Sequence, residues 1–146
     1  MTSNATRADV LTRALRAAVD GDIRPVADDF TDDVKAWTPA LIAASRDELF
    51  AAYEGRDGAF SGFELDVVPL DVNGAYACAE WTVTMTHTGP LDVAVDHTVP
   101  PTGMRIVVHG VTVAEFRGEQ ICALRQYWDE FSVLEQLGVL REPTMT

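Results

Sequence analysis

The sequence predicts an α+β fold in which helices come first and a curved antiparallel sheet follows. Three observations support this prediction: apolar residues recur at helical spacing early in the chain, long Val- and Thr-rich runs begin at Phe63, and a short helical segment comes last. A sheet that bends around helices forms a cone. We therefore expect an apolar cavity at the open end of the cone, where a small ligand can bind.

A first helix is predicted near the N-terminus. Thr6 and Asp9 have the spacing of a capping box at its start, and Gly21 is a typical helix end. Its apolar face is formed by Val10, Leu11, Ala14, Leu15, Ala18 and Val19. The helix is therefore predicted to be amphipathic and to cover a core.

Two further helical pieces are predicted before the strands begin. A short one spans Ile23 to Phe30, and an extended segment follows around Lys35 to Thr38. A third helix is expected from Ser45, whose hydroxyl can cap it while Glu48 reaches back. Its apolar side carries Leu49, Phe50 and Tyr53. The first part of the chain is therefore predicted to be mostly helical.

Four strands are predicted from residue 63 onward, because Val, Thr, Ile and aromatic residues dominate there. Turn residues such as Asn73, Gly74 and Gly118 separate the runs, which favours an antiparallel arrangement. The runs are FELDVVPLDV, AYACAEWTVTMTH, MRIVVHGVTVAEF and QICALRQYWD. A short final helix, FSVLEQLGVL, is expected to end near Leu137, just before Gly138.

The longest break between the predicted strands runs from Thr88 to Gly103. It contains a Pro-Pro pair and is too long for a tight hairpin. Loops of this kind are often placed over binding pockets. We therefore expect a long loop that can cover a pocket.

Length and charge limit the possible partners. A chain of 146 residues is the size of one domain, so a single domain over residues 1–146 is expected. The formal charge of -12, from 23 acidic against 11 basic residues, argues against nucleic acid and anionic membranes, which attract clustered positive charge. Because the sequence has neither a signal-peptide pattern nor an apolar run of about 18 residues, a cytoplasmic protein is expected.

No motif in the sequence indicates a metal or cofactor. Patterns such as HxH, HExxH, CxxC and GxSxG are absent, and Cys78 and Cys122 lie in strand-like runs, as buried free thiols would. If the protein is an enzyme, we expect it to work without a cofactor, by acid/base chemistry and the shape of its pocket.

The segment from Pro100 to Gly138 contains a PPTG turn, a strand with a central glycine, a strand that ends in an aromatic residue and an aspartate, and a helix that ends in LxQLG. Together with the segment from Val34 to Leu49, it resembles the SnoaL-like branch of the nuclear transport factor 2-like superfamily. The resemblance implies a cone-shaped, cystatin-like α+β barrel with a deep apolar pocket, and a homodimer formed through the outer face of the sheet. This superfamily hosts polyketide cyclases, epoxide hydrolases, isomerases, dehydratases and binding domains.

The resemblance also assigns positions to the catalytic residues of the family. In the SnoaL-like cyclases an Asp on the last strand is the general acid/base of an aldol closure, and a His on the preceding strand assists it. Counted back from the LxQLG helix, these positions fall on Gln126 and Thr112, and Asp129 matches a second Asp of the family pattern. Gln takes up no proton at neutral pH and Thr is a poor base, so the cyclase mechanism does not carry over residue by residue.

Three residues are candidates for catalysis. Asp129, beside Trp128, is either a general acid/base in an apolar cavity or the cap of the last helix. Gln126 is either a pocket amide that holds a carbonyl oxygen or a structural amide. His109 precedes Gly110, where a bulge could turn it into the pocket, or it lies on the outer face of the sheet. Alternation along the last strand places Gln126 and Trp128 on one face and Asp129 on the other.

Further candidates are expected in the wall and at the mouth of the pocket. His87 ends a strand and His97 lies in the long break, so either could reach the mouth or be merely exposed. Aromatic side chains suit a flat or polycyclic ligand, and core packing is the alternative role for each. The residues expected to contact a substrate are Trp37, Tyr53, Trp81, Trp128, Phe116 and Thr112.

Two functions are compatible with these observations. The first is a cofactor-independent acid/base enzyme that cyclises, isomerises or hydrolyses a hydrophobic, polyketide-like metabolite. The second is a non-catalytic module of the same fold that binds a small apolar ligand or dimerises. Asp129 turned into a closed cavity with Gln126 or His109 favours the enzyme, whereas Asp129 bonded to the helix start beside a wholly apolar cavity favours binding.

Overall fold

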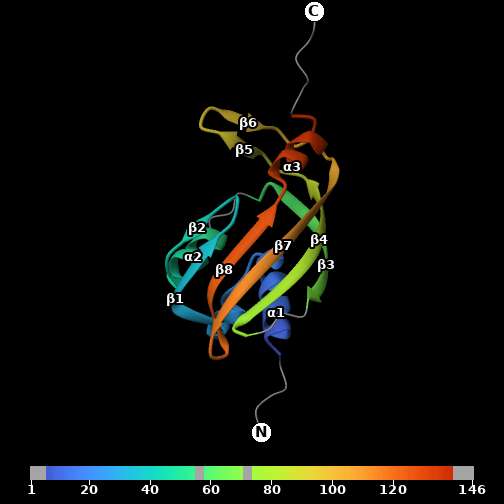
Figure 1. Cartoon of the computed structure of the whole chain (residues 1–146). Coiled ribbons are helices and arrows are strands. Elements are labelled where there is room, and N and C mark those ends of the chain that lie inside the picture. Colours follow the sequence, from blue (N-terminus) through green and yellow to red (C-terminus); the bar gives the residue numbers. More distant parts are fainter. Residues whose placement is uncertain (1–5, 55–57, 71–73, 140–146) are drawn as a thin grey trace, which may run out of the picture.

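A six-stranded sheet forms the centre of the computed structural model, which describes residues 6–54, 58–70 and 74–139. The strand order is β2-β1-β8-β7-β4-β3, with β1 parallel to β8 and the other pairs antiparallel. The elements are α1 (Arg7–Asp20), the 3-10 helix η1 (Arg24–Asp29), β1 (Phe30–Trp37), β2 (Ile42–Ala43), α2 (Arg46–Glu54), β3 (Phe60–Leu70), β4 (Tyr76–His87), β5 (Leu91–Ala94), β6 (His97–Val99), β7 (Arg105–Arg117), β8 (Gln120–Trp128) and α3 (Glu130–Gln136). The sheet curves around α1, and α3 and the β5–β6 hairpin lie at the same end (Figure 1). The predicted α+β cone is confirmed.

Helix α1 has the caps that the sequence predicts. The Thr6 hydroxyl accepts a hydrogen bond from the backbone N–H of Asp9 at 3.1 Å, and the Asp9 carboxylate accepts one from the N–H of Thr6 at 3.1 Å. Gly21 ends the helix with a φ of 82°, which residues with a Cβ rarely adopt. The buried face packs against β3 and β4, and each fully buried leucine contributes ~1.5–3 kcal/mol to folding.

The four predicted strands are β3, β4, β7 and β8, each paired antiparallel with the next. A further long strand, β1, begins at Phe30, earlier than the extended segment predicted at residues 35–38. Phe30, Val34 and Ala36 are buried, whereas the charged residues between them are exposed. The run of charges hides this alternation in the sequence, but the buried positions place β1 in the sheet beside β8.

The segment from Thr88 to Gly103, predicted as a long loop, has short strands within it. It contains a two-stranded sheet, in which Leu91 pairs with Val99 and Asp92 with Thr98. The strands have only 4 and 3 residues, too few for a period to show in the sequence. Gly103 ends the segment with a φ of 71°, and its N–H donates to the carbonyl oxygen of His87 at 2.8 Å, which returns the chain to the sheet.

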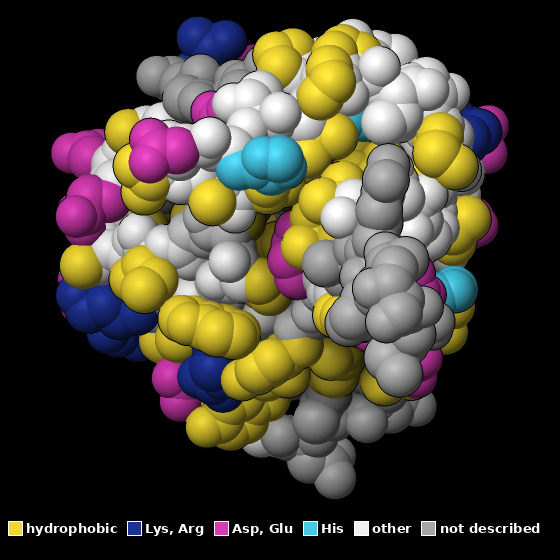
Figure 2. Space-filling view, turned by 90° about the horizontal axis from the view of Figure 1, so that it is seen from above, with side chains coloured by type: hydrophobic (Ala, Val, Ile, Leu, Met, Phe, Trp, Pro, Cys, Tyr) yellow, Lys and Arg dark blue, Asp and Glu magenta, His cyan; other side chains and the backbone are white. Residues whose placement is uncertain are grey.

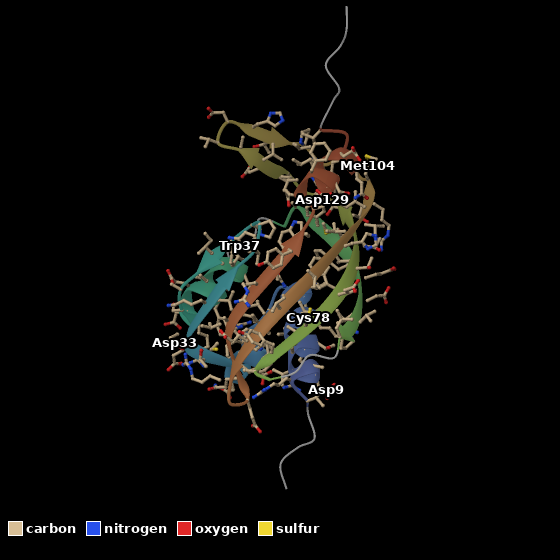
Figure 3. The ribbon with its side chains drawn as sticks, viewed as in Figure 1. Asp9, Asp33, Trp37, Cys78, Met104 and Asp129 are labelled. Carbon is tan, nitrogen blue, oxygen red and sulfur yellow. The ribbon has the colours of Figure 1, made fainter. Side chains whose placement is uncertain are left out.

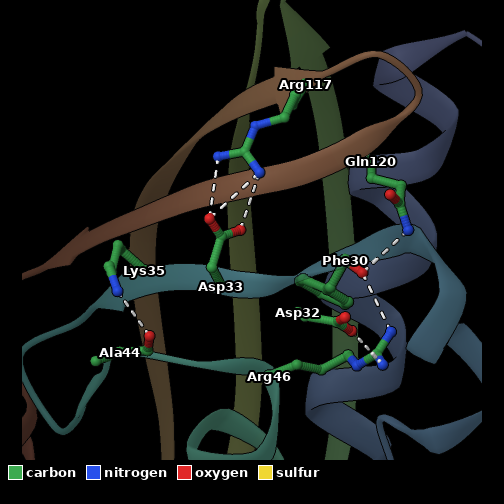
Figure 4. A network of polar contacts seen from close by, with 8 residues as sticks. All are labelled: Phe30, Asp32, Asp33, Lys35, Ala44, Arg46, Arg117 and Gln120. Carbon is green, nitrogen blue, oxygen red and sulfur yellow. Dashed lines mark hydrogen bonds and ion pairs between the residues drawn. The ribbon is translucent and has the colours of Figure 1, made fainter.

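Polar contacts join β1, α2 and the β7–β8 turn (Figure 4). Arg117 pairs with Asp33 at 3.0 Å, and Arg46 pairs with Asp32 at 2.6 Å. The hydrogen bonds from Arg117 hold the pKa of the Asp33 carboxyl below its usual value, and Asp33 in turn raises the pKa of Arg117. Both partners are exposed, so we expect little net stabilisation from this pair.

The outer face of the sheet carries exposed aromatic residues. Trp37 and Tyr127 lie with their ring centroids 5.2 Å apart, on the face opposite α1, and Figure 3 shows Trp37 at the edge near β8. The Tyr76 hydroxyl donates to the Glu115 carboxylate at 3.0 Å, which raises the pKa of Tyr76. Cys78 lies on the same face and is half-buried, and burial raises the pKa of its thiol. In the described part of the chain, every helix is too short or too polar to span a membrane.

Candidate functional site

A cavity of about 550 Å³ lies between α1, the inner face of the sheet and the β5–β6 hairpin. Its wall is mainly apolar, with aliphatic residues from α1, β3, β4 and β7 and the aromatic residues Tyr53, Phe60, Phe63, Trp81 and Trp128. Figure 2 looks down on this end of the molecule and shows a hollow lined by hydrophobic side chains, with acidic atoms set among them. This volume lies within the range of small-molecule sites.

Few polar groups of the wall are free to contact a ligand. The Thr38 hydroxyl already accepts hydrogen bonds from the N–H groups of Ala40 and Leu41, at 3.0 and 2.9 Å. Of the described residues in the wall, Glu130 is the one carboxylate and Gln126 the one amide. These two side chains are the amide and the carboxylate available for ligand contact, and Tyr53 adds a phenol to the wall.

Gln126 faces the cavity, as the alternation along β8 predicts. Only 8% of its surface is exposed, and its neighbour across the sheet is Thr112 on β7. No hydrogen bond among the described residues engages its side-chain amide. Because an amide both donates and accepts, Gln126 can hold a carbonyl or hydroxyl oxygen inside an apolar wall.

Glu130 is a functional candidate that the sequence analysis missed. It is the first residue of α3, and its carboxylate accepts a hydrogen bond from Trp128 Nε1 at 2.7 Å. The indole thereby holds the carboxylate, which is exposed to solvent, at the edge of the cavity. The sequence shows a glutamate directly after the cap residue of a predicted helix. Whether that side chain faces the cavity depends on how α3 packs against β7, which the sequence pattern does not reveal.

Asp129 is the cap of α3. Its Oδ1 accepts a hydrogen bond from the backbone N–H of Ser132 at 3.1 Å, its side chain is exposed, and Figure 3 shows it at the start of the helix. Asp129 is absent from the wall of the cavity. Of the two roles left open for this residue, the geometry supports the cap.

We expect Asp129→Ala to lower the free energy of unfolding by ~1 kcal/mol, because the N–H of Ser132 loses its acceptor. Asp129→Asn is the matched variant, since asparagine caps helices about as well as aspartate, and its stability should stay near that of the wild type. Urea denaturation followed by circular dichroism measures both. Equal stability of the two variants contradicts the cap.

Thr112 supports the wall from behind instead of contacting a ligand. Its side chain is fully buried, and its Oγ1 accepts a hydrogen bond from Trp81 Nε1 at 2.9 Å. The Trp81 indole lies across Gly110 and meets Trp128 edge-on, with ring centroids 6.2 Å apart. The predicted substrate contact at Thr112 is thus replaced by a role in orienting Trp81.

Three other predicted site residues lie away from the cavity. His109 is exposed on the outer face, with Nδ1 3.1 Å from the Thr82 hydroxyl, and β7 has no bulge there that turns it inward. Trp37 lies on the same outer face. Phe116 is buried, and the guanidinium carbon of Arg7 lies 5.4 Å from the centroid of its ring. The pairing of β7 with β4 continues without a register shift through His109 and Gly110, so His109 stays on the outer face, while Gly110 makes room for the indole of Trp81. Tyr53, Trp81 and Trp128 do line the cavity.

The two remaining histidines differ in their surroundings. His97 is exposed on β6, whereas His87 is fully buried at the end of β4. Across the described ranges, no group of three or more His, Cys, Asp or Glu side chains has the arrangement of a metal site.

A curved sheet that wraps around helices and encloses an apolar cavity is the architecture of nuclear transport factor 2-like and ketosteroid isomerase-like proteins. The family model for the SnoaL-like domain matches residues 11–124, and the chain belongs to the SnoaL-like family. No curated protein matches the sequence.

Solved structures share this fold at low sequence identity. AclR, a proposed hydroxylase from Streptomyces galilaeus, is 22% identical with a TM-score of 0.75, over 95% of this chain and 100% of that one. A proposed SnoaL-like polyketide cyclase from Jannaschia sp. CCS1 is 17% identical with a TM-score of 0.77, over 97% and 99%. A protein of ketosteroid isomerase-like fold from Catenulispora acidiphila, in complex with trimethylamine, is 16% identical with a TM-score of 0.71, over 90% and 94%. These similarities establish the fold. The reaction has to be inferred from the residues of the cavity.

Proposed function

We propose that this protein is a cofactor-independent acid/base enzyme that acts on a hydrophobic, polyketide-like metabolite by cyclisation, isomerisation or hydrolysis. One observation carries the proposal: an apolar cavity of about 550 Å³ presents one amide, Gln126, and one carboxylate, Glu130, among its described wall residues. An amide that holds an oxygen and a carboxylate that moves a proton are the two groups that enolisation of a ketone requires. Membership of the SnoaL-like family and the cyclase-like neighbours support the same class of chemistry.

In the proposed reaction, the ketone oxygen accepts a hydrogen bond from the Gln126 amide, and the Glu130 carboxylate removes a proton from the adjacent carbon. The C–H bonding pair forms the C=C bond of the enolate, and the negative charge on oxygen is stabilised by the amide N–H. Return of the proton to a different carbon isomerises the ligand. Attack of the enolate carbon on a second carbonyl closes a ring, and Glu130 then gives its proton to the new alkoxide.

Glu130, and not the sequence candidate Asp129, is the proton-transfer group in this reaction. The Asp129 carboxylate caps α3, and His109 lies outside the cavity, so neither residue is assigned a step of the reaction. Tyr53, Trp81 and Trp128 provide flat surfaces for the ring system of the ligand.

A non-catalytic binding module is the second candidate, and the cap at Asp129 favours it. By the family resemblance, the positions of the acid/base pair fall on Gln126 and Thr112, and under this second proposal the cavity binds a ligand without turnover. Under both candidates we propose a cytoplasmic single-domain protein that dimerises through the outer face of its sheet, where Trp37 and Tyr127 are 43% and 45% exposed.

Hydrogen–deuterium exchange of 2-tetralone separates the two candidates. This bicyclic ketone fits the chemistry of the wall, and exchange at the carbons beside its carbonyl reports enolisation by NMR. We expect the protein to accelerate exchange over buffer. Binding of 2-tetralone, measured by tryptophan fluorescence, without faster exchange identifies a binding module.

The Gln126→Leu variant tests the contact to the ketone oxygen. We expect the affinity for 2-tetralone to fall by up to about tenfold, because one hydrogen bond is lost. The affinity for tetralin, the hydrocarbon without the carbonyl, should stay unchanged. An equal loss for both ligands indicates a change of cavity shape and contradicts the contact.

A further inference from the structure

We propose that His87 is a second ligand-binding residue, which donates its Nε2–H to an oxygen acceptor at the far end of an elongated hydrophobic ligand. This inference rests on the proposed function, in which Gln126 holds the first oxygen. It assigns the ligand class as a rigid, elongated molecule with oxygen acceptors near both ends.

The hydrogen bonds of His87 fix which nitrogen carries the proton. Its Nδ1 accepts a hydrogen bond from the backbone N–H of Thr102 at 3.2 Å and lies 3.0 Å from the Thr102 hydroxyl. That hydroxyl accepts from the N–H of Met104 at 3.2 Å, so its own proton is free to point at Nδ1. With Nδ1 accepting, the neutral ring carries its proton on Nε2.

The Nε2–H of His87 is a buried donor that has no acceptor among the residues that the structure describes. The side chain is 0% exposed, and Nε2 has no hydrogen-bond partner among the described residues. A buried N–H that lacks an acceptor destabilises the fold, and such groups commonly mark a place for a ligand or water. The Thr102 bonds hold the ring so that this donor cannot turn toward the backbone instead.

His87 adjoins the wall of the cavity, although it is not one of the lining residues. Trp81, Val83 and Met85 are successive inward residues of β4, all three line the cavity, and His87 is the next inward position. Its cross-strand neighbour, Phe60, also lines the cavity, with ring centroids 5.4 Å apart. His87 therefore lies behind the rim that Phe60 forms, at the end of the cavity where the hairpin begins.

The spacing along β4 explains why the ligand has to be elongated. Ala79 on β4 pairs with Thr112 on β7, and Thr112 pairs with Gln126 on β8, so the three residues form one row across the sheet. Eight residues separate Ala79 from His87, which is about 26 Å along an extended strand. Curvature of the sheet and the inward reach of both side chains shorten the gap, but a small bicyclic ligand does not span it.

Two substitutions separate the donor from the structural acceptor of His87. Asparagine places its amide oxygen near the position of Nδ1, so His87→Asn keeps an acceptor for Thr102 and removes the donor. Glutamine places its amide nitrogen near Nε2, so His87→Gln keeps the donor and leaves the Thr102 N–H without its acceptor. The first variant is expected to keep the melting temperature, and the second to lower it.

The probes are two rigid steroids that differ by one remote oxygen, androst-4-ene-3,17-dione and androst-4-en-3-one. We expect the wild type to bind the dione about tenfold more tightly in tryptophan fluorescence titrations. His87→Asn should abolish the preference and His87→Gln should keep it. In the wild type, the Nε2–H proton resonance of His87 should move downfield with the dione alone.

A wild type without preference, or a preference that survives in His87→Asn, overturns the assignment. If the wild type does not accelerate exchange of 2-tetralone but still prefers the dione, the proposed enzyme activity is refuted and the His87 site is supported.

Discussion

The Glu130→Gln variant is expected to lose at least ~100-fold of the catalysed exchange of 2-tetralone while it still binds the ketone. Glutamine keeps the length of the side chain and an oxygen that accepts from Trp128 Nε1, so the wall and the indole stay in place. It removes the only property that the mechanism uses, which is the capacity to take up a proton. General acid/base groups commonly contribute 10²–10⁴-fold, which sets the expected size of the loss.

The matched control is Glu135→Gln, which removes one negative charge from an exposed position on the same helix, outside the cavity wall. Its exchange rate should equal that of the wild type, so a general effect of net charge on the exchange is excluded. Asp129→Asn should also keep the exchange, since its side chain is used in the cap. Full activity of Glu130→Gln, or loss of activity in Asp129→Asn at unchanged stability, contradicts the assignment of Glu130.

The parts of the fold that local chemistry determines could be predicted from the sequence. The capping box of Thr6 and Asp9 and the end of α1 at Gly21 involve residues only a few positions apart. The inward direction of Gln126 follows from the two-residue period of β8, and the cap at Asp129 from an acidic residue before a helix. In each case the interaction is settled within one element or its first turn.

The predictions that were wrong or incomplete concern residues whose positions depend on contacts between distant elements. Glu130 reaches the cavity because α3 packs on β7, and no local pattern encodes that angle. His87 is buried because the turn at Thr102, 15 positions later, folds back onto it. Phe116 and Trp37 have the same aromatic character as Trp81, yet only Trp81 faces the cavity. Residue type alone could not separate wall, core and surface.

Gly110 is the position where a single added methyl group should most disturb the site. Gly110 is absent from the glycines with positive φ, so the backbone itself tolerates alanine. The restriction comes from Trp81, since a Cβ at residue 110 would lie 2.7 Å from Cε2 of the indole and closer still to two further ring atoms. A shift of the ring toward the cavity that it lines would strain the hydrogen bond from its Nε1 to Thr112 and the contact with Trp128.

We therefore expect Gly110→Ala to lower the free energy of unfolding by ~3 kcal/mol, from overpacking combined with strain on the buried Trp81–Thr112 hydrogen bond. For a chain of this size, that is a fall in melting temperature of about 6–12 °C. The control is the same substitution in a Trp81→Phe background, where the smaller ring leaves space and the loss should shrink to less than ~1 kcal/mol. An equal loss in both backgrounds would show that Gly110 serves the backbone of β7 and not the indole. A loss that depends on Trp81 would establish that the cavity wall is built by Gly110, Thr112 and Trp81 together, across two neighbouring strands.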